Sequence, residues 1–122
     1  MSVFSKLFGS APRTASVSAV EARDLQRSGA LLVDVREKGE WDAGHAPKAK
    51  HHPLRGLPTS MQRLPTDRTI VVVCRSGNRS ARAAKVLAKS GFDVVNLTGG
   101  MTAWRGAGLP MVNSRGKKGA VR

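Results

Sequence analysis

One cysteine of the chain lies in a short segment whose residue types favour nucleophilic chemistry. The segment follows an apolar run and consists of Cys74, Arg75, Ser76, Gly77, Asn78, Arg79 and Ser80. Where a strand passes into a helix, backbone N–H groups and the positive end of the helix dipole form a cradle for an anion. A thiol in such a cradle, with two arginines nearby, has a pKa below its usual value of about 8.5. We therefore expect Cys74 to be a thiolate nucleophile in a site that favours negative charge.

The alternative interpretation of Cys74 is a buried structural residue, because free cysteine is among the most buried residue types. The polar composition of the six residues that follow Cys74 argues against it, since a packing position does not require two arginines, two serines and an asparagine. Gly77 adds a backbone that can fold toward the sulfur without a steric penalty. We prefer the catalytic interpretation.

Short apolar strands alternate with helices around this segment. Strands are predicted at residues 31–35, 49–52, 69–74 and 94–97. Helices are predicted from a capping box at Ser18 and Glu21 to Gly29, and at 37–43, 58–64, 80–89 and 101–105. This alternation predicts an α/β domain with a mainly parallel central sheet and helices on both faces. Ligands of such sheets bind at the carboxyl ends of strands, which is where Cys74 falls.

The chain length of 122 residues predicts one domain. Residues 1–15 are expected to be a flexible leader, and residues 16–112 the folded domain. Residues 113–122 are rich in glycine and cations, so we expect a basic, disordered tail.

Composition excludes several classes of protein. A single cysteine allows neither an internal disulfide nor a cysteine-rich zinc site. The longest apolar run, 70–74, is far shorter than the ~18 residues of a membrane-spanning helix. The first residues lack the apolar stretch of a secretory signal, so we expect a soluble, cytoplasmic protein.

The net charge of +13 is carried entirely by residues 46–122. Such an excess predicts anionic partners, which include small oxyanions, thiolates, RNA and acidic proteins. The near absence of aromatic residues argues against single-stranded nucleic acid bound by stacking.

In four places, and in the same order, the sequence resembles the rhodanese family. The motifs are Asp-Val-Arg-Glu at 34–37, Gly-His-Ala-Pro at 44–47, the segment 74–80, and Gly-Gly-Met-Thr-Ala-Trp at 99–104. The resemblance covers about residues 16–112 and implies a single rhodanese-like domain. It implies that Cys74 takes a sulfur from a donor such as thiosulfate, forms a persulfide, and passes the sulfur to cyanide or a thiol. No cofactor beyond this covalent persulfide is implied.

The same resemblance implies roles for the neighbours of Cys74. Arg75 and Arg79 would attract the donor and hold its anionic oxygens. Backbone or hydroxyl contacts would come from Ser76, Gly77, Asn78 and Ser80. The related phosphatases have a loop one residue longer between cysteine and arginine, and an arsenate reductase would need a second cysteine, so neither fits this chain.

Two further groups of residues flank this site in the sequence. Asp34 and Arg36 are two apart at a strand end and so share a face, and we expect an ion pair that braces the rim of the site. No metal is expected at the histidines, since His51 and His52 would point to opposite faces of a strand. These histidines replace a more apolar pair of the family, and with Lys48 they lie along the approach to the site.

Three functions are consistent with these features. The first is a sulfurtransferase acting through a Cys74 persulfide. The second is a non-catalytic persulfide carrier or sulfur-relay module whose basic half docks an acidic protein. The third, an RNA-associated sulfur donor, has only the net charge in its favour, and we expect no nucleic-acid partner.

Overall fold

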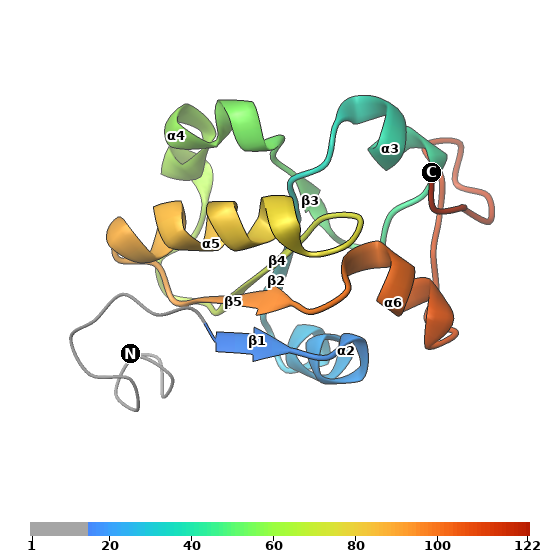
Figure 1. The fold of residues 1–122 in the computed structure, drawn as a ribbon, viewed down its shortest axis with the longest axis horizontal. Helices are drawn as coiled ribbons and strands as arrows, with labels where there is room; N and C mark the ends of the chain where they lie inside the picture. The colour runs from blue at the N-terminus through green and yellow to red at the C-terminus, as the bar shows by residue number, and fades with distance from the viewer. Residues whose placement is uncertain (1–14) are drawn as a thin grey trace.

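The computed structural model describes residues 15–122, and its framework is a five-stranded sheet. The strands lie in the order β1–β5–β4–β2–β3, and every pair of neighbours is parallel (Figure 1). Their bounds are β1 (Ala15–Val17), β2 (Leu31–Asp34), β3 (Lys50–His51), β4 (Ile70–Val73) and β5 (Val94–Leu97). The parallel sheet confirms the predicted α/β class.

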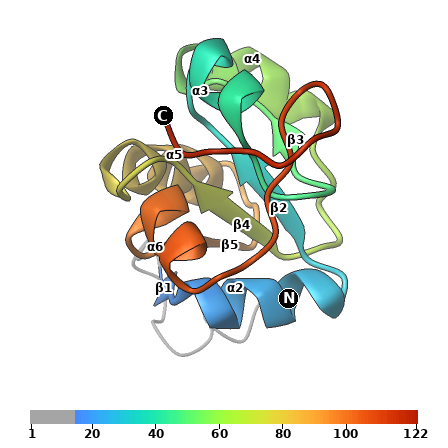
Figure 2. The ribbon, with the colours of Figure 1, turned by 90° about the vertical axis from the view of Figure 1, so that its right-hand side faces the viewer.

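Helices cover both faces of this sheet (Figure 2). Their bounds are α2 (Ala19–Arg27), α3 (Lys38–Ala43), α4 (Leu57–Ser60), α5 (Asn78–Lys89) and α6 (Gly100–Gly106), with 3₁₀ turns η1 (Leu54–Gly56) and η2 (Met61–Arg63). Within residues 15–122, no helix combines the length and the apolar character that crossing a membrane requires.

Alternation along the central strand β4 divides the core into two layers. Val71 and Val73 pack with residues of α2 and α6 on one face of the sheet. Ile70 and Val72 pack with residues of α4 and α5 on the other face, and Cys74 continues this second series. Because successive side chains of a strand point to opposite faces, the position of Cys74 two residues after Val72 directs its sulfur toward α5.

Most predicted elements are present, with small differences at their ends. The capping box of α2 is formed, since the backbone N–H of Ser18 donates to Glu21 Oε1 and that of Glu21 donates to Ser18 Oγ. Helix α5 begins at Asn78, two residues earlier than predicted, after Gly77 in the left-handed region at φ 115°. The predicted leader lies outside the described residues except for Ala15, which begins the unpredicted edge strand β1.

The C-terminal segment 113–122 packs against the domain, whereas its composition predicted a disordered tail (Figures 1 and 2). Val112 forms β-bridges with His45 and Lys118, and the N–H of Ala120 donates to the carbonyl of Ala43 at 2.9 Å. A Cβ on Gly44 would collide with the backbone of Ala120. Glycine at 44 and 119 allows the backbone of the C-terminal segment to pack closely against the turn after α3. The glycines that suggested a mobile tail therefore include one that is required for packing.

Candidate active site

Cys74 lies directly after β4, at the carboxyl edge of the sheet, and its sulfur faces hydrogen-bond donors. Its Sγ accepts a hydrogen bond from the N–H of Gly77 at 3.0 Å and from the hydroxyl of Ser80 at 3.3 Å. The positive φ of Gly77 turns the loop back over the sulfur, and α5 begins immediately afterwards. The structure therefore brings Cys74, Gly77 and Ser80 together in the expected cradle.

Two opposing influences set the pKa of Cys74. Burial raises it, because the side chain is only 1% exposed and water cannot stabilise a thiolate there. The hydroxyl of Ser80 and the N–H groups of Ser80, Gly77 and Ser76 lower it. These donors outweigh burial, and the pKa lies below its ordinary value, in the predicted direction. Cys74 is thus buried like a core residue but surrounded by donors that stabilise negative charge.

The loop is held from behind by β5 and α6. The carbonyls of Cys74 and Arg75 accept from the N–H groups of Met101 at 2.8 Å and Thr102 at 3.1 Å. A Cβ on Gly100 would collide with these same carbonyls, so only glycine allows α6 to begin this close. The amide of Asn96, on β5, donates to the carbonyl of Gly77 at 3.3 Å. The geometry of the cradle therefore depends on segments 19 or more residues further along the chain than the atoms they hold.

Arg79 is placed differently from the sequence expectation. Its Nη1 and Nη2 donate to Glu40 Oε1 and Oε2 at 2.6 and 2.8 Å, so this carboxylate already occupies the fork that was expected to hold donor oxygens. The hydrogen bond from Arg79 lowers the pKa of Glu40 and keeps it ionised. Arg79 thereby fastens the loop to α3. Arg75 is exposed and has no ion pair within residues 15–122, which leaves it available to an anion.

Asp34 and Arg36 form the expected ion pair at the end of β2. Arg36 Nη2 lies 2.7 Å from Asp34 Oδ2, and Arg36 Nε donates to Oδ1 at 2.9 Å. Both residues are fully buried, and Nη2 also donates to the carbonyl of Gly44 at 2.6 Å. The pair fixes the segment between β2 and the turn after α3, beside the loop that follows β4.

The remaining predicted site residues contribute little through their side chains. Ser76 and Asn78 are exposed, and Ser76 acts on Cys74 through its backbone N–H. Glu40 and Asn96 were not among the residues expected at the site, and Gly100 was expected only as part of the motif at 99–104, without a role. A signal for Asn96 was present, because it is a polar residue within a buried apolar strand. Within the described chain, no three His, Cys, Asp or Glu residues are grouped as potential metal ligands.

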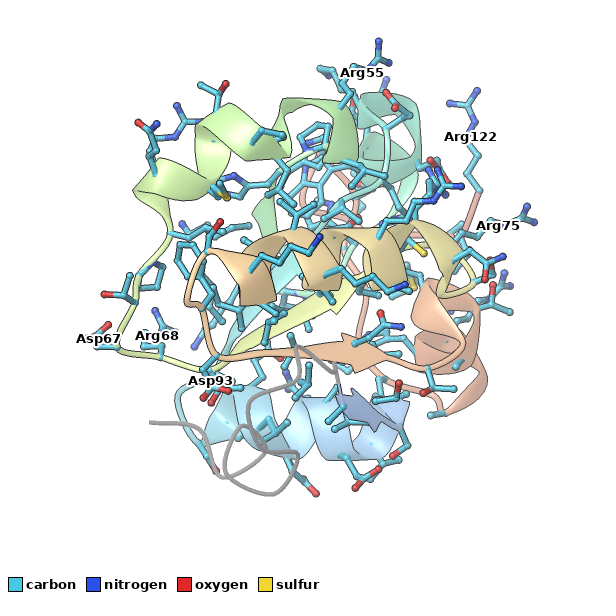
Figure 3. All side chains as sticks on the ribbon, turned by 60° about the vertical axis from the view of Figure 1, so that its left-hand side comes forward. Arg55, Asp67, Arg68, Arg75, Asp93 and Arg122 are labelled. Carbon is cyan, nitrogen blue, oxygen red and sulfur yellow. The ribbon has the colours of Figure 1, made fainter. Side chains whose placement is uncertain are left out.

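Charge is distributed unevenly over the molecule. The labelled side chains of Arg55, Arg75 and Arg122 lie on one side of the molecule, and Asp67, Arg68 and Asp93 lie together on the other (Figure 3). The net charge of +13 attracts anions to the molecule.

The fold and site define an α/β domain with a cysteine nucleophile in an anion cradle. Comparison with known proteins is consistent with this class, because residues 18–107 match the model of the rhodanese-like domain. The chain therefore belongs to the rhodanese-like domain family.

Individual relatives agree with this family. The chain is 42% identical over 87 residues to a sulfurtransferase of Allochromatium vinosum, which covers 70% of this chain and 81% of that protein. It is 43% identical over 79 residues to a putative sulfurtransferase of Bacillus subtilis, which covers 65% and 77%. A rhodanese-related protein from Thermoplasma volcanium superposes with a TM-score of 0.76 at 30% identity, covering 80% of this chain and 97% of that structure.

Proposed function

We propose that this protein is a sulfurtransferase that carries sulfur as a persulfide on Cys74. In the first step the Cys74 thiolate attacks the outer sulfur of thiosulfate, the S–S bond of thiosulfate breaks, and sulfite leaves with the electron pair. In the second step cyanide or a thiolate attacks the outer sulfur of the persulfide, and Cys74 leaves as a thiolate. Two displacements replace one difficult transfer, and neither needs a redox partner or a bound cofactor.

The observation that carries this proposal is the set of donors around Cys74 Sγ. The N–H of Gly77 and the hydroxyl of Ser80 stabilise the thiolate before the first step. Preorganised donors in a site that excludes water also favour the charge on the outer sulfur of the persulfide. The lowered pKa of Cys74 supports the same conclusion, because only the thiolate is a good nucleophile.

Arg75 supports a small anionic donor. It is the exposed cation of the loop, it follows Cys74 directly, and within the described residues no carboxylate pairs with it. Thiosulfate and small persulfides both carry the negative charge that such a cation attracts. Arg79 supports transfer indirectly, by fastening the loop to Glu40.

To test this function, the purified protein is mixed with thiosulfate and cyanide, and the rate of thiocyanate formation is measured. We expect steady turnover by the natural chain and only the uncatalysed rate for Cys74→Ala. Thermal unfolding of both proteins verifies that the variant is folded. Turnover by Cys74→Ala equal to that of the natural chain would overturn the proposal.

A non-catalytic persulfide carrier is the second candidate, and the burial of Cys74 favours it. A sulfur on a residue that is 1% exposed is shielded from small acceptors, so in this candidate its release depends on a protein partner. The basic residues of segment 46–122 would then dock an acidic protein, in the cytoplasm, where a lone cysteine is kept reduced. This candidate predicts one added sulfur by intact mass after exposure to thiosulfate, together with slow formation of thiocyanate.

A further inference from the structure

A cavity separate from the loop opens between the start of α3, the end of β3 and the turns around α4. Its volume is about 480 Å³. Its lining includes Glu37, Lys38, His51, His52, Arg55 and Arg63. None of the loop residues 74–80 belongs to this lining, so the cradle around Cys74 does not account for the cavity.

Strand register places His52, one wall of this cavity, on the same side of the sheet as the sulfur of Cys74. Asp34 pairs with His51 on one side and with Val73 on the other. The next residue of each strand continues this row as His52, Val35 and Cys74, and side chains in one row of a parallel sheet point to the same face. Two strand intervals separate His52 from Cys74, which is about 10 Å. Val35 lies between them in this row and is 1% exposed, so a molecule that joins the cavity to the sulfur passes over the carboxyl edge of the sheet and spans about 10 Å.

The charge on the cavity lining is mainly positive. Glu37 is the one carboxylate in the lining of the cavity, and it forms an ion pair with Arg55, whose Nη2 lies 2.7 Å from Glu37 Oε2. Lys38 forms an ion pair with Asp42. Arg63 has neither an ion pair nor a side-chain hydrogen bond among the residues that the structure describes, and its charge acts on His52. Arg63 is therefore available to bind an anionic group in the cavity.

The histidines of the lining form fixed, flat walls. The ring of His51 stacks on Trp41 with centroids 4.8 Å apart, and its Nε2 donates to the carbonyl of Arg36 at 2.7 Å. His52 is 8% exposed, and its Nδ1 lies 2.9 Å from Ser60 Oγ. Burial, Arg63 and His51 lower the pKa of His52, so its ring is neutral at neutral pH. The neutral ring of His52 and the adjacent Pro53 suit the carbon skeleton of an organic molecule better than a bare inorganic ion.

We propose that this cavity binds the anionic end of the thiol that accepts sulfur from Cys74. The acceptor is an organic thiol whose carboxylate or phosphate is separated from its sulfur by a chain spanning about 10 Å. Its thiolate attacks the outer sulfur of the persulfide, the S–S bond to Cys74 breaks, and the acceptor leaves as a persulfide. This inference rests on the proposed sulfurtransferase function and names the acceptor class of that same site.

The kinetic test compares acceptors that differ only in charge. Mercaptooctanoate and mercaptooctanol share one chain, whereas mercaptopropionate has the carboxylate on a chain too short to span the two sites. We expect the natural protein to prefer mercaptooctanoate over mercaptooctanol in kcat/KM, with no such preference for mercaptopropionate over mercaptoethanol. Arg63→Gln should lower kcat/KM for mercaptooctanoate about fivefold, the size of one exposed charge contact, and leave turnover with cyanide unchanged.

Arg68→Gln is the matched control, because it removes the same charge from the opposite edge of the sheet, where Arg68 Nε donates to the carbonyl of Gly29 (Figure 3). Equal losses in Arg63→Gln and Arg68→Gln would show a general effect of charge and overturn the proposal. An unchanged acid preference in Arg63→Gln would overturn it as well.

A binding measurement separates failure of the cavity from failure of the function. Cys74→Ala is titrated with octanoate, which has no thiol, while NMR follows the ring protons of His51 and His52. We expect shifts that saturate, and that weaken when Arg63→Gln is added. Binding without any turnover in the natural chain would overturn the sulfurtransferase function and keep the anion site. Turnover without binding would keep the function and overturn the anion site.

Discussion

The loop that follows β4 and the cavity beside β3 lie on the same edge of one sheet but are built differently. The loop surrounds Cys74 with backbone N–H groups and one hydroxyl, held by Met101, Thr102 and Asn96. The cavity is lined mainly by long or aromatic side chains, and its free cation sits on a 3₁₀ turn. Backbone N–H groups supply most of the donors to the sulfur, so the loop depends less on the surrounding side chains than the cavity does. The cavity depends on side-chain identity and can change without disturbing the chemistry.

Arg36 contacts residues beside both the loop and the cavity, so replacing it disturbs both regions. We expect this substitution to have the largest effect on the free energy of unfolding. Arg36→Met leaves Asp34 buried and uncompensated, which should cost about 3–5 kcal/mol of unfolding free energy. The carbonyl that fixes His51 and the contact to Gly44 are disturbed in the same variant. Urea unfolding measures the loss.

The double variant Asp34→Leu with Arg36→Met is the control for this prediction. It leaves no unpaired charge and should recover part of the stability. A single variant that loses less than about 1 kcal/mol would show that the buried pair does not support either region.

Ser80→Ala affects the loop alone. It removes the hydroxyl donor from Cys74 Sγ, so the pKa of the thiol rises and less thiolate is present at neutral pH. We expect turnover at neutral pH to fall about tenfold, as for one hydrogen bond to a charged group, and the rising limb of the pH–rate profile to move to higher pH. The preference for an anionic acceptor should not change.

Ser90→Ala, at the far end of α5, is the matched control for Ser80→Ala. It should reproduce the natural pH–rate profile. A profile for Ser80→Ala that coincides with that of Ser90→Ala would mean that this hydroxyl does not stabilise the thiolate.

Two carboxylate variants give the smallest effects and compare the regions directly. Glu40→Gln releases Arg79 beside the loop, and Glu37→Gln releases Arg55 beside the cavity. Each should cost at most about 1 kcal/mol of unfolding free energy, since the pairs are partly or largely exposed. We expect Glu40→Gln to lower the KM for thiosulfate, because Arg79 is freed to contact it, and to lower kcat, because the loop loses its attachment to α3. We expect Glu37→Gln to lower the KM for mercaptooctanoate. A lower KM for mercaptooctanoate in Glu40→Gln, or for thiosulfate in Glu37→Gln, would contradict the proposal that the loop binds the donor and the cavity binds the acceptor.

The loop could be predicted from the sequence because all of its residues are contiguous. Residues 74–80 carry the nucleophile, the turn and the start of a helix in one segment, and local rules for glycine and helix ends apply to them directly. The elements of the sheet were also predictable, because buried parallel strands leave short apolar runs such as 70–74.

Features that depend on pairing between distant segments were not predictable. Glu40 and Arg79 are 39 residues apart, and nothing local indicates that they meet. His52 lies in the same row as Cys74 because of the register with which β3 pairs with β2. A strand of two residues has too short a sequence pattern to predict that register. The packing of segment 113–122 was missed for a related reason, since Gly119 is explained only by the backbones of Gly44 and Val112 opposite it.

The stacking of Trp41 gives the protein an optical reporter of its own. The chain has two tryptophans, and Trp104 is fully buried with its Nε1–H bonded to the carbonyl of Pro110. Trp41 instead lies between the rings of His45 and His51, and His51 lines the cavity. A ligand that enters the cavity changes the surroundings of Trp41 and leaves Trp104 as a constant background. Intrinsic fluorescence therefore follows occupancy of the cavity without a label, even in a protein that lacks its cysteine.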